Sequence, residues 1–294
     1  IDIGDQFLKN IPNIGVTDGV DNGVLENSLL EYTTTAPDSY TNGLDVHMGK
    51  NWVVRNNTFK NFKASGALAG PAVLIWNGST DTIVTGKTFI DNKREISLGL
   101  NNTKTFTDHA RGTIANNFII RNNVSGADVS IAVYDSPQTK VYYNTILMRG
   151  GYPSAIEYRF SRTMGVDIRN NLTDAAITAR DGAAGTVTNN VINATLGMFA
   201  NPTVGDLHLL STATQAIAKG VTVSITTDID GQARPTVPDA GADQFSSSVP
   251  TSTPVPTATP TPTQTPTPVP TPTPTLTGTP TINISVPSGS ALPA

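Results

Sequence analysis

One short motif recurs along most of this chain at a nearly constant interval. Seven segments read apolar, polar, apolar, polar, Asn, then Thr or a large apolar residue, as in VVRNNTF and TIANNFI. Their anchor positions are Asn27, Asn57, Lys87, Asn117, Asn144, Asn171 and Asn190, with spacings of 30, 30, 30, 27, 27 and 19 residues. Such a period is typical of a solenoid, in which every repeat forms one turn and packs only against its neighbours.

A second apolar segment precedes most of the anchors by 11 to 13 residues, with one gap of 19. These segments read LDVH, VLIW, ISLG, IAVY, IEYR and ITAR, and their central residues are Val46, Ile75, Leu98, Val133, Tyr158 and Ala179. Only 14% of the residues are charged, against about a quarter in an average protein, and no long stretch favours a helix. The sequence therefore predicts an all-β fold, a right-handed parallel β-helix of about seven to eight coils, followed by an extended Thr/Pro-rich tail.

The recurring asparagines have a structural role in such a fold. Asn tolerates the left-handed backbone conformation of a sharp bend, and stacked Asn side chains hydrogen-bond from one coil to the next. We therefore predict a ladder at one corner of the coils, formed by Asn57, Asn117, Asn144, Asn171 and Asn190. Lys87 interrupts this ladder, and Gly86 before it is expected to supply the unusual backbone angle.

The composition changes sharply at Ser246. Thirteen of the 21 prolines lie beyond this residue, in a segment without Asp, Glu, Lys or Arg. We divide the chain into β-helix coils over 1–205, a final coil and C-terminal cap over 206–245, a linker over 246–280 and a terminal segment over 281–294. Pro at this density favours an extended polyproline II linker, and the composition is also typical of an O-glycosylated extracellular stalk.

The terminal segment contains a candidate β-strand. Residues 281–286 alternate polar and apolar side chains, which places Ile282, Ile284 and Val286 on one face. Six residues cannot form a sheet alone, so this strand is expected to add to a sheet edge of its own subunit or of another. The alternative is a chance alternation within an unstructured tail.

The second apolar segment of each coil also offers a candidate binding surface. Its central residue is expected to point inward, so its two neighbours form outward columns along the body. One column contains His47, Trp76, Gly99, Tyr134, Arg159 and Arg180, and the other contains Asp45, Leu74, Ser97, Ala132, Glu157 and Thr178. Sugar rings stack on aromatic faces and guanidinium groups pair with carboxylates, so the first column suits an acidic polysaccharide. The candidate substrate-binding residues are Trp76, Tyr134, Arg159 and Arg180.

A β-elimination on such a polysaccharide requires a base near the sugar C5 proton and a cation that neutralises the uronate. If the protein is an enzyme, the candidate catalytic residues are His47, Arg159 and Arg180, and the activity is that of a polysaccharide lyase or a glycoside hydrolase. The alternative is that these are solvated side chains, with Asp45–His47 and Glu157–Arg159 as ordinary local pairs. We favour a protein without enzymatic activity, because the sequence offers no convergent acid, base and metal ligands.

Charge and composition narrow the remaining classes of ligand. A net charge of -4 disfavours nucleic acid, and no apolar run is long enough for a membrane span. The three histidines are too few and too dispersed to predict a histidine metal site. Asp228-Ile229-Asp230-Gly231 weakly resembles a calcium loop but lacks the remaining ligands, so a turn is predicted there. We therefore predict no cofactor and leave only a weak calcium site open.

Several strings resemble right-handed parallel β-helix proteins of the pectin-lyase-like superfamily. They are NGLDVH, NWVVRNNTF, NAT-type sequons, SAIEYRF, GVDIRNNLTDAAITARDG and GDLHLLSTATQAIAKG…TDIDGQARP…DAGADQF, and they cover roughly Asn22 to Phe245. The last string resembles the final coil and cap of secreted β-helix proteins that carry a surface-anchoring tail. The resemblance implies a secreted or cell-surface protein. It implies no single activity, because the fold hosts lyases, hydrolases, adhesins and structural proteins.

Two functions fit these features. Members of this superfamily usually carry further coils before the segment that matches residues 5–9, so the first coil is expected to expose a sheet edge. Our main hypothesis is a structural protein that joins this edge to the C-terminal strand of another copy, giving a head-to-tail extracellular filament. The alternative is a carbohydrate-active or carbohydrate-binding protein whose tail serves as a stalk. The expected partner is thus another copy of the chain or a polysaccharide.

Overall fold

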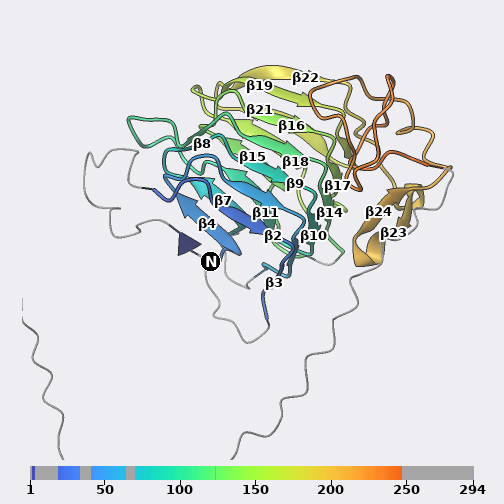
Figure 1. Cartoon of the computed structure of the whole chain (residues 1–294), viewed down its shortest axis with the longest axis horizontal. Coiled ribbons are helices and arrows are strands. Elements are labelled where there is room, and N and C mark those ends of the chain that lie inside the picture. The colour runs from blue at the N-terminus through green and yellow to red at the C-terminus, as the bar shows by residue number, and fades with distance from the viewer. Residues whose placement is uncertain (1, 4–18, 34–40, 64–69, 123, 247–294) are drawn as a thin grey trace, which may run out of the picture. The chain divides into compact units, whose positions relative to one another are not determined.

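The chain forms a parallel β-solenoid, which confirms the predicted all-β fold class (Figure 1). The computed structural model describes residues 2–3, 19–33, 41–63, 70–122 and 124–246, and 41% of the protein is strand against 3% helix. The predicted linker and the candidate strand with Ile282, Ile284 and Val286 lie outside the described residues.

Three parallel sheets run along the solenoid, and each complete turn contributes one strand to each sheet. In spatial order, sheet 1 contains β1 (Asp2–Ile3), β4 (Leu44–His47), β7 (Pro71–Trp76), β11 (Arg94–Leu98), β15 (Ile131–Tyr134), β18 (Ser154–Arg159) and β21 (Ala176–Arg180). Sheet 2 contains β2 (Val24–Glu26), β5 (Val53–Arg55), β9 (Ile83–Thr85), β13 (Thr113–Ala115), β16 (Lys140–Tyr142), β19 (Met164–Arg169) and β22 (Ala184–Thr188). Sheet 3 contains β3 (Leu29–Glu31), β6 (Thr58–Lys60), β10 (Thr88–Ile90), β14 (Phe118–Ile120), β17 (Thr145–Leu147) and β20 (Leu172–Thr173).

About five turns are complete, from β4 to β20, and strands of partial turns lie beyond them at both ends. The predicted count of seven to eight coils therefore stays a prediction. Outside the three sheets, β8 (Ser79–Thr80) and β12 (His109–Ala110) form a separate parallel pair.

The core is a set of apolar columns inside the solenoid. Residues at equivalent positions of successive turns pair in register, and in sheet 1 the inward column runs through Val46, Ile75, Leu98, Val133 and Tyr158. In sheet 3 the rings of Phe59 and Phe89 stack with centroids 5.2 Å apart. Each turn therefore buries its apolar side chains against the turns above and below it, as expected for a solenoid.

Two adjacent residues have different roles at the corner between sheets 2 and 3. The first, here called the bending position, has a positive φ of 52° to 63° and is occupied by Asn27, Asn56, Gly86, Asn116, Tyr143, Asn170 and Asn189. The second residue is the anchor position. The expectation that the anchor Asn bends the backbone is therefore wrong, because the bend lies one residue earlier. Gly86 bends the chain before Lys87, as expected. The register between β3 and β6 places Ser28, and not Asn27, opposite Asn57. In the first turn Ser28 therefore occupies the anchor position, and Asn27 occupies the bending position.

The anchor asparagines from Asn117 to Asn190 form a continuous hydrogen-bonded ladder. Asn117 Nδ2 donates to Asn144 Oδ1 at 2.8 Å. The Nδ2 and backbone N of Asn144 both donate to Asn171 Oδ1, at 2.9 and 3.0 Å, and Asn171 repeats both bonds to Asn190 Oδ1 at 2.9 Å. Asn144 Nδ2 also reaches the backbone carbonyl of Ile114 at 3.1 Å. The ladder thus pairs backbone groups that the corner removes from the sheets.

Lys87 interrupts this ladder with a buried amine. Its side chain is 0% exposed, and Nζ has no hydrogen-bond partner within the described part of the chain. Burial and, to a smaller extent, the nearby Arg55 guanidinium lower the pKa of Lys87 to about 6, against the opposing effect of Glu26. Asn57 lies below this break. Its side chain bonds to the turn beneath it, with Nδ2 donating to the Leu25 carbonyl and Oδ1 accepting the Ser28 N–H.

Residues 192–245, here called the flanking segment, leave the stack and cover one side of it (Figure 1). Within the segment, β23 (Phe199–Asn201) and β24 (Asp206–Leu209) pair antiparallel and alternate with the short 3-10 turns η2 (Leu196–Met198) and η3 (Pro202–Val204). Its apolar residues share one cluster with sheet 3, formed mainly by Met198, Phe199, Leu207 and Leu209 with Phe118, Ile120, Leu147 and Leu172. The residues predicted as final coil and cap, 206–245, therefore add no described strand to the three sheets.

The first turn leaves the interior of the stack partly uncovered. Leu25 and Leu30 point inward but are only half-buried, whereas Val54 and Phe59 at the same positions of the next turn are 0% exposed. β2 and β3 are edge strands, and Leu29 on the outer face is 65% exposed.

The opposite end of the stack is uncovered in the same way. All five residues of the edge strand β22 are exposed. Val187 points inward and is 37% exposed, whereas Ile168 beneath it is fully buried. Both ends of the described stack thus present unpaired strand edges beside uncovered apolar side chains.

Candidate functional site

The predicted column of polysaccharide-binding residues lies on the outer face of sheet 1. Register pairs His47 with Trp76 on β4 and β7, and it aligns Tyr134, Arg159 and Arg180 on β15, β18 and β21. The structure therefore brings these five residues into one file. Their side chains are divided into two separate networks, one around Trp76 and one around Glu157.

The network around Trp76 is closed to solvent. The indole Nε1 donates to Asp45 Oδ1 at 2.9 Å and lies 3.2 Å from His47 Nε2. Lys104 covers the ring, with Nζ 4.6 Å from its centroid. His47 is only 3% exposed and pairs with Asp45 at 3.3 Å, so the expected local pair forms but the expected solvation does not. The loop that carries Lys104 is the physical reason, because it lies over this end of the sheet.

The network around Glu157 joins residues from neighbouring turns. Tyr134 donates its hydroxyl to Glu157 Oε2 at 3.1 Å, and Arg180 Nη1 lies 3.2 Å from the same oxygen. Arg159 pairs with Asp181 instead, so the alternative of a local Glu157–Arg159 pair is wrong. Glu157 is paired across neighbouring turns, whose strands are only about 4.8 Å apart.

These contacts occupy the candidate catalytic arginines and the Tyr134 hydroxyl. The Glu157 carboxylate raises the pKa of Arg180, and burial together with Glu157 raises the pKa of the Tyr134 hydroxyl. Arg159 and Arg180 already have carboxylate partners, so a uronate must compete with Asp181 and Glu157. Both guanidinium groups of the column are therefore paired with carboxylates of the chain itself.

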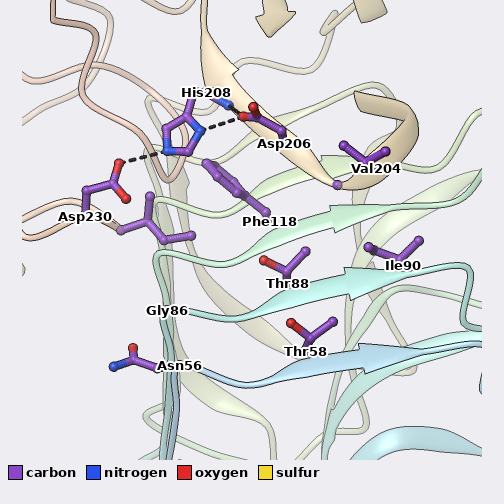
Figure 2. Close-up of a pocket in the computed structure, with 12 residues that line it drawn as sticks. Asn56, Thr58, Gly86, Thr88, Ile90, Phe118, Val204, Asp206, His208 and Asp230 are labelled. Atoms are coloured by element: carbon purple, nitrogen blue, oxygen red, sulfur yellow. Dashed lines mark hydrogen bonds and ion pairs between the residues drawn. The ribbon is translucent and has the colours of Figure 1, made fainter. Parts of the chain in front are cut away.

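A groove of about 530 Å³ lies elsewhere, between sheet 3 and the flanking segment (Figure 2). Its floor includes residues of three neighbouring strands, namely Thr58, Thr88 and Phe118. Its wall includes polar residues of the flanking segment, namely Asp206, His208 and Asp230. The groove therefore joins parts of the chain that are far apart in the sequence.

His208 is the central polar group of this groove. Its Nδ1 lies 2.5 Å from Asp206 Oδ1, and its Nε2 lies 2.8 Å from Asp230 Oδ2 (Figure 2). The hydrogen bond to Asp230 and the bond to Asp206 raise the pKa of His208 to about 9, against the opposing effect of burial. The edge of the Phe118 ring packs against the imidazole with centroids 5.1 Å apart.

The segment that weakly resembles a calcium loop forms a turn closed by its own first residue. Asp228 Oδ1 accepts the backbone N–H groups of Asp230 and Gln232 at 3.0 and 2.7 Å, and its Oδ2 accepts the N–H of Gln244 at 3.0 Å. Gly231 has a φ of 84°, a conformation that favours glycine. The Asp228 carboxylate is thus used in the turn, which fixes the position of Asp230 beside His208.

Sequence reasoning missed the groove. Asp206, His208 and Asp230 all lie in strings quoted for the superfamily resemblance, but nothing in their spacing indicates that they meet. The alternation in DLHL does place Asp206 and His208 on one face of a strand, which was the available signal.

The comparisons with known proteins leave the fold as the only classification. No protein-family model matches the chain, and no curated protein matches it. No helix in the described residues is long and apolar enough to cross a membrane.

Proposed function

We propose that this chain is a secreted or cell-surface structural protein that assembles head to tail through the ends of its solenoid. The observation that carries the proposal is the uncovered interior at both ends of the stack. In the described residues, the inward-facing Leu25 and Leu30 are only half-buried at one end, and the inward-facing Val187 is 37% exposed at the other. Burial of such side chains between two copies is favourable, by about 25 cal/mol for each Å² of apolar surface.

The two ends are geometrically compatible with each other. β2 and β22 are the opposite edges of sheet 2, which is parallel throughout. A second copy that places its β2 beside β22 continues the same sheet at the usual spacing of about 4.8 Å. Because the joined surfaces differ, the contact is heterologous and need not close, so it leads to a filament.

The state of the predicted catalytic residues supports a structural protein. His47 is buried between Asp45 and Trp76, and Arg159 and Arg180 are paired with carboxylates. Membership of the pectin-lyase-like superfamily belongs to this proposal and is supported by the parallel β-solenoid. The Thr/Pro composition of 246–280 supports an extracellular stalk, and strand 281–286 is a further candidate for adding to an open edge.

The test compares assembly of the wild-type chain with that of edge variants. Val24→Lys combined with Leu29→Lys places two charges on edge strands, which opposes strand addition. Ile83→Lys is the matched control, because Ile83 is 42% exposed and lies in the same column as Val24 but inside the stack. We expect filaments in negative-stain images of wild type and of the control, and single particles for the double variant.

Light scattering after size-exclusion chromatography gives the mass of each variant over a range of concentrations. A wild-type chain that stays monomeric at all concentrations contradicts the proposal. Deletion of 281–294 separates the two modes of contact. If it abolishes assembly while the double lysine variant still assembles, the C-terminal strand and not the end of the stack makes the contact.

A second candidate function is binding of a polysaccharide, and the groove beside the flanking segment favours it. The floor offers the hydroxyls of Thr58 and Thr88, and the wall offers the carboxylates of Asp206 and Asp230. Carboxylates repel uronates, so this groove suits a neutral polysaccharide better than the acidic one expected from the sequence. Affinity electrophoresis in gels with neutral or acidic polysaccharides tests this. Retardation only by uronate polymers, or none by any, contradicts it.

A further inference from the structure

The flanking segment brings three metal-ligating side chains together at the groove. His208, Asp230 and Asp243 each offer one nitrogen or oxygen atom, and all three atoms lie within 4.8 Å of one another. Ligand atoms around one zinc ion are about 3.3 Å apart, because each bond is about 2.0 to 2.2 Å long. His208 Nε2 and Asp230 Oδ2, at 2.8 Å, are already close to that separation.

Asp243 adds a largely buried carboxylate whose position is held by the backbone. It is 4% exposed, and one of its oxygens accepts the Leu209 N–H at 2.7 Å. Its other oxygen accepts no hydrogen bond from any residue that the structure describes. This second oxygen is not sealed from solvent, so an ion can reach it without displacing a hydrogen bond from the described residues.

The surroundings orient the imidazole in the way that metal sites require. Asp206 bonds Nδ1 of His208, which leaves Nε2 directed toward Asp230 (Figure 2). A carboxylate on the far nitrogen of a ligating histidine fixes its tautomer and strengthens it as a ligand. The turn that Asp228 closes positions the backbone of Asp230 beside His208.

We propose that His208, Asp230 and Asp243 bind one divalent transition-metal ion, with zinc as the best match. One imidazole and two carboxylates are a donor set that suits zinc, whereas calcium and magnesium prefer oxygen ligands alone. His208 and Asp230 line the groove, so a remaining coordination position faces solvent and takes water or a sugar hydroxyl. The site does not depend on the proposed assembly, because its residues all belong to the flanking segment.

The test is calorimetric titration of the full-length chain with zinc chloride after treatment with a chelator. We expect one equivalent of zinc per chain, with binding lost in Asp243→Asn and in His208→Gln. Asp206→Asn keeps all three ligands, so it should weaken affinity by about 10-fold to 100-fold and leave the stoichiometry at one. Asp181→Asn, which removes a carboxylate from the turn after β21, is the control and should bind as the wild type does.

Cobalt gives a second readout that does not require any variant to fold. Cobalt bound to nitrogen and oxygen ligands at low coordination number should show intense visible absorption bands. Added zinc should displace the cobalt ion, and the bands should then disappear. Two results overturn the proposal. One is the absence of zinc binding to wild type, which leaves His208 as a cation that only joins two carboxylates. The other is zinc binding that Asp243→Asn and His208→Gln both leave unchanged in folded protein.

Discussion

The anchor position at the corner between sheets 2 and 3 is occupied by chemically different side chains, with an amide in most turns and an amine in one. From Asn117 to Asn190 every anchor is an amide, and Asn144 and Asn171 each accept from the amide before and donate to the amide after. At Lys87 the anchor is an amine that is equally buried but has no hydrogen-bond partner in the described structure. The comparison shows that the backbone path of the corner does not depend on the anchor, because the bend comes from the preceding residue. The anchor instead determines how well the buried polar groups are paired.

The largest expected effect comes from breaking the ladder at its centre. Asn144→Ala removes the donor to the Ile114 carbonyl and to Asn171, and it also removes the acceptor of Asn117 Nδ2. We expect a loss of about 4 kcal/mol in the free energy of unfolding, because several buried groups lose their partners. Urea denaturation followed by circular dichroism measures this. Asn190→Ala, at the half-exposed end of the ladder, should cost only about 1 kcal/mol, and equal costs would contradict a stabilising role for the buried amides.

Removing the buried amine should increase the free energy of unfolding. Lys87→Met keeps an unbranched side chain of similar length and eliminates the unpaired Nζ. We expect this variant to be more stable than wild type by about 3 kcal/mol at neutral pH, because the cost of desolvating the amine disappears. A variant no more stable than wild type in urea would mean that the amine has a partner in solution.

The pH dependence of stability gives a second test of the buried Lys87 amine. The pKa of Lys87 is lowered from 10.5 to about 6 in the folded chain, so between these values the unfolded state binds more protons. Stability therefore rises with pH across this window, with a contribution from Lys87 of up to about 1.4 kcal/mol per pH unit. Lys87→Met should lose this contribution while the other titrating groups keep theirs. Parallel slopes for the two proteins between about pH 7 and 9 would refute the assignment.

The smallest effect is expected at the bending position. Gly86→Ala places a methyl group at a φ of 63° and 2.6 Å from Asn56 Oδ1. The substitution should cost about 1 kcal/mol in backbone strain, plus the displacement of Asn56. Gly126→Ala is the matched control, since Gly126 has a φ of 61° and the added methyl group would meet open space. In thermal melts, the melting temperature of Gly86→Ala should be lower than that of Gly126→Ala.

The sequence was a good guide wherever neighbouring turns decide the structure. The period of the anchors predicts the stack, and the apolar centres of LDVH, VLIW and IAVY predict the register of sheet 1, because both depend on local alternation. The bending position was misplaced by one residue, since Asn-Asn pairs such as Asn56-Asn57 do not reveal which amide turns the chain.

The sequence was a poor guide wherever distant segments meet. The sequence predicts the outward column as a binding surface or, alternatively, as solvated side chains, but Lys104 from a connecting loop covers Trp76. His208 and Asp243 are 35 residues apart, and they approach each other only because the flanking segment folds back on sheet 3. Contacts of this kind carry no periodic signal, so they emerge only from the folded chain.

The constant interval between Asn57, Lys87 and Asn117 makes whole rungs interchangeable units. Excising 87–116 would join Gly86 directly to Asn117 and delete one full circuit of the backbone. The shortened polypeptide would bring Asn57 and Asn117 into adjacent circuits, so an amide would stand above an amide where an amine now intervenes. Duplication or loss of such units changes the length of the rod without requiring a new core, which is a route by which proteins of this shape can diversify.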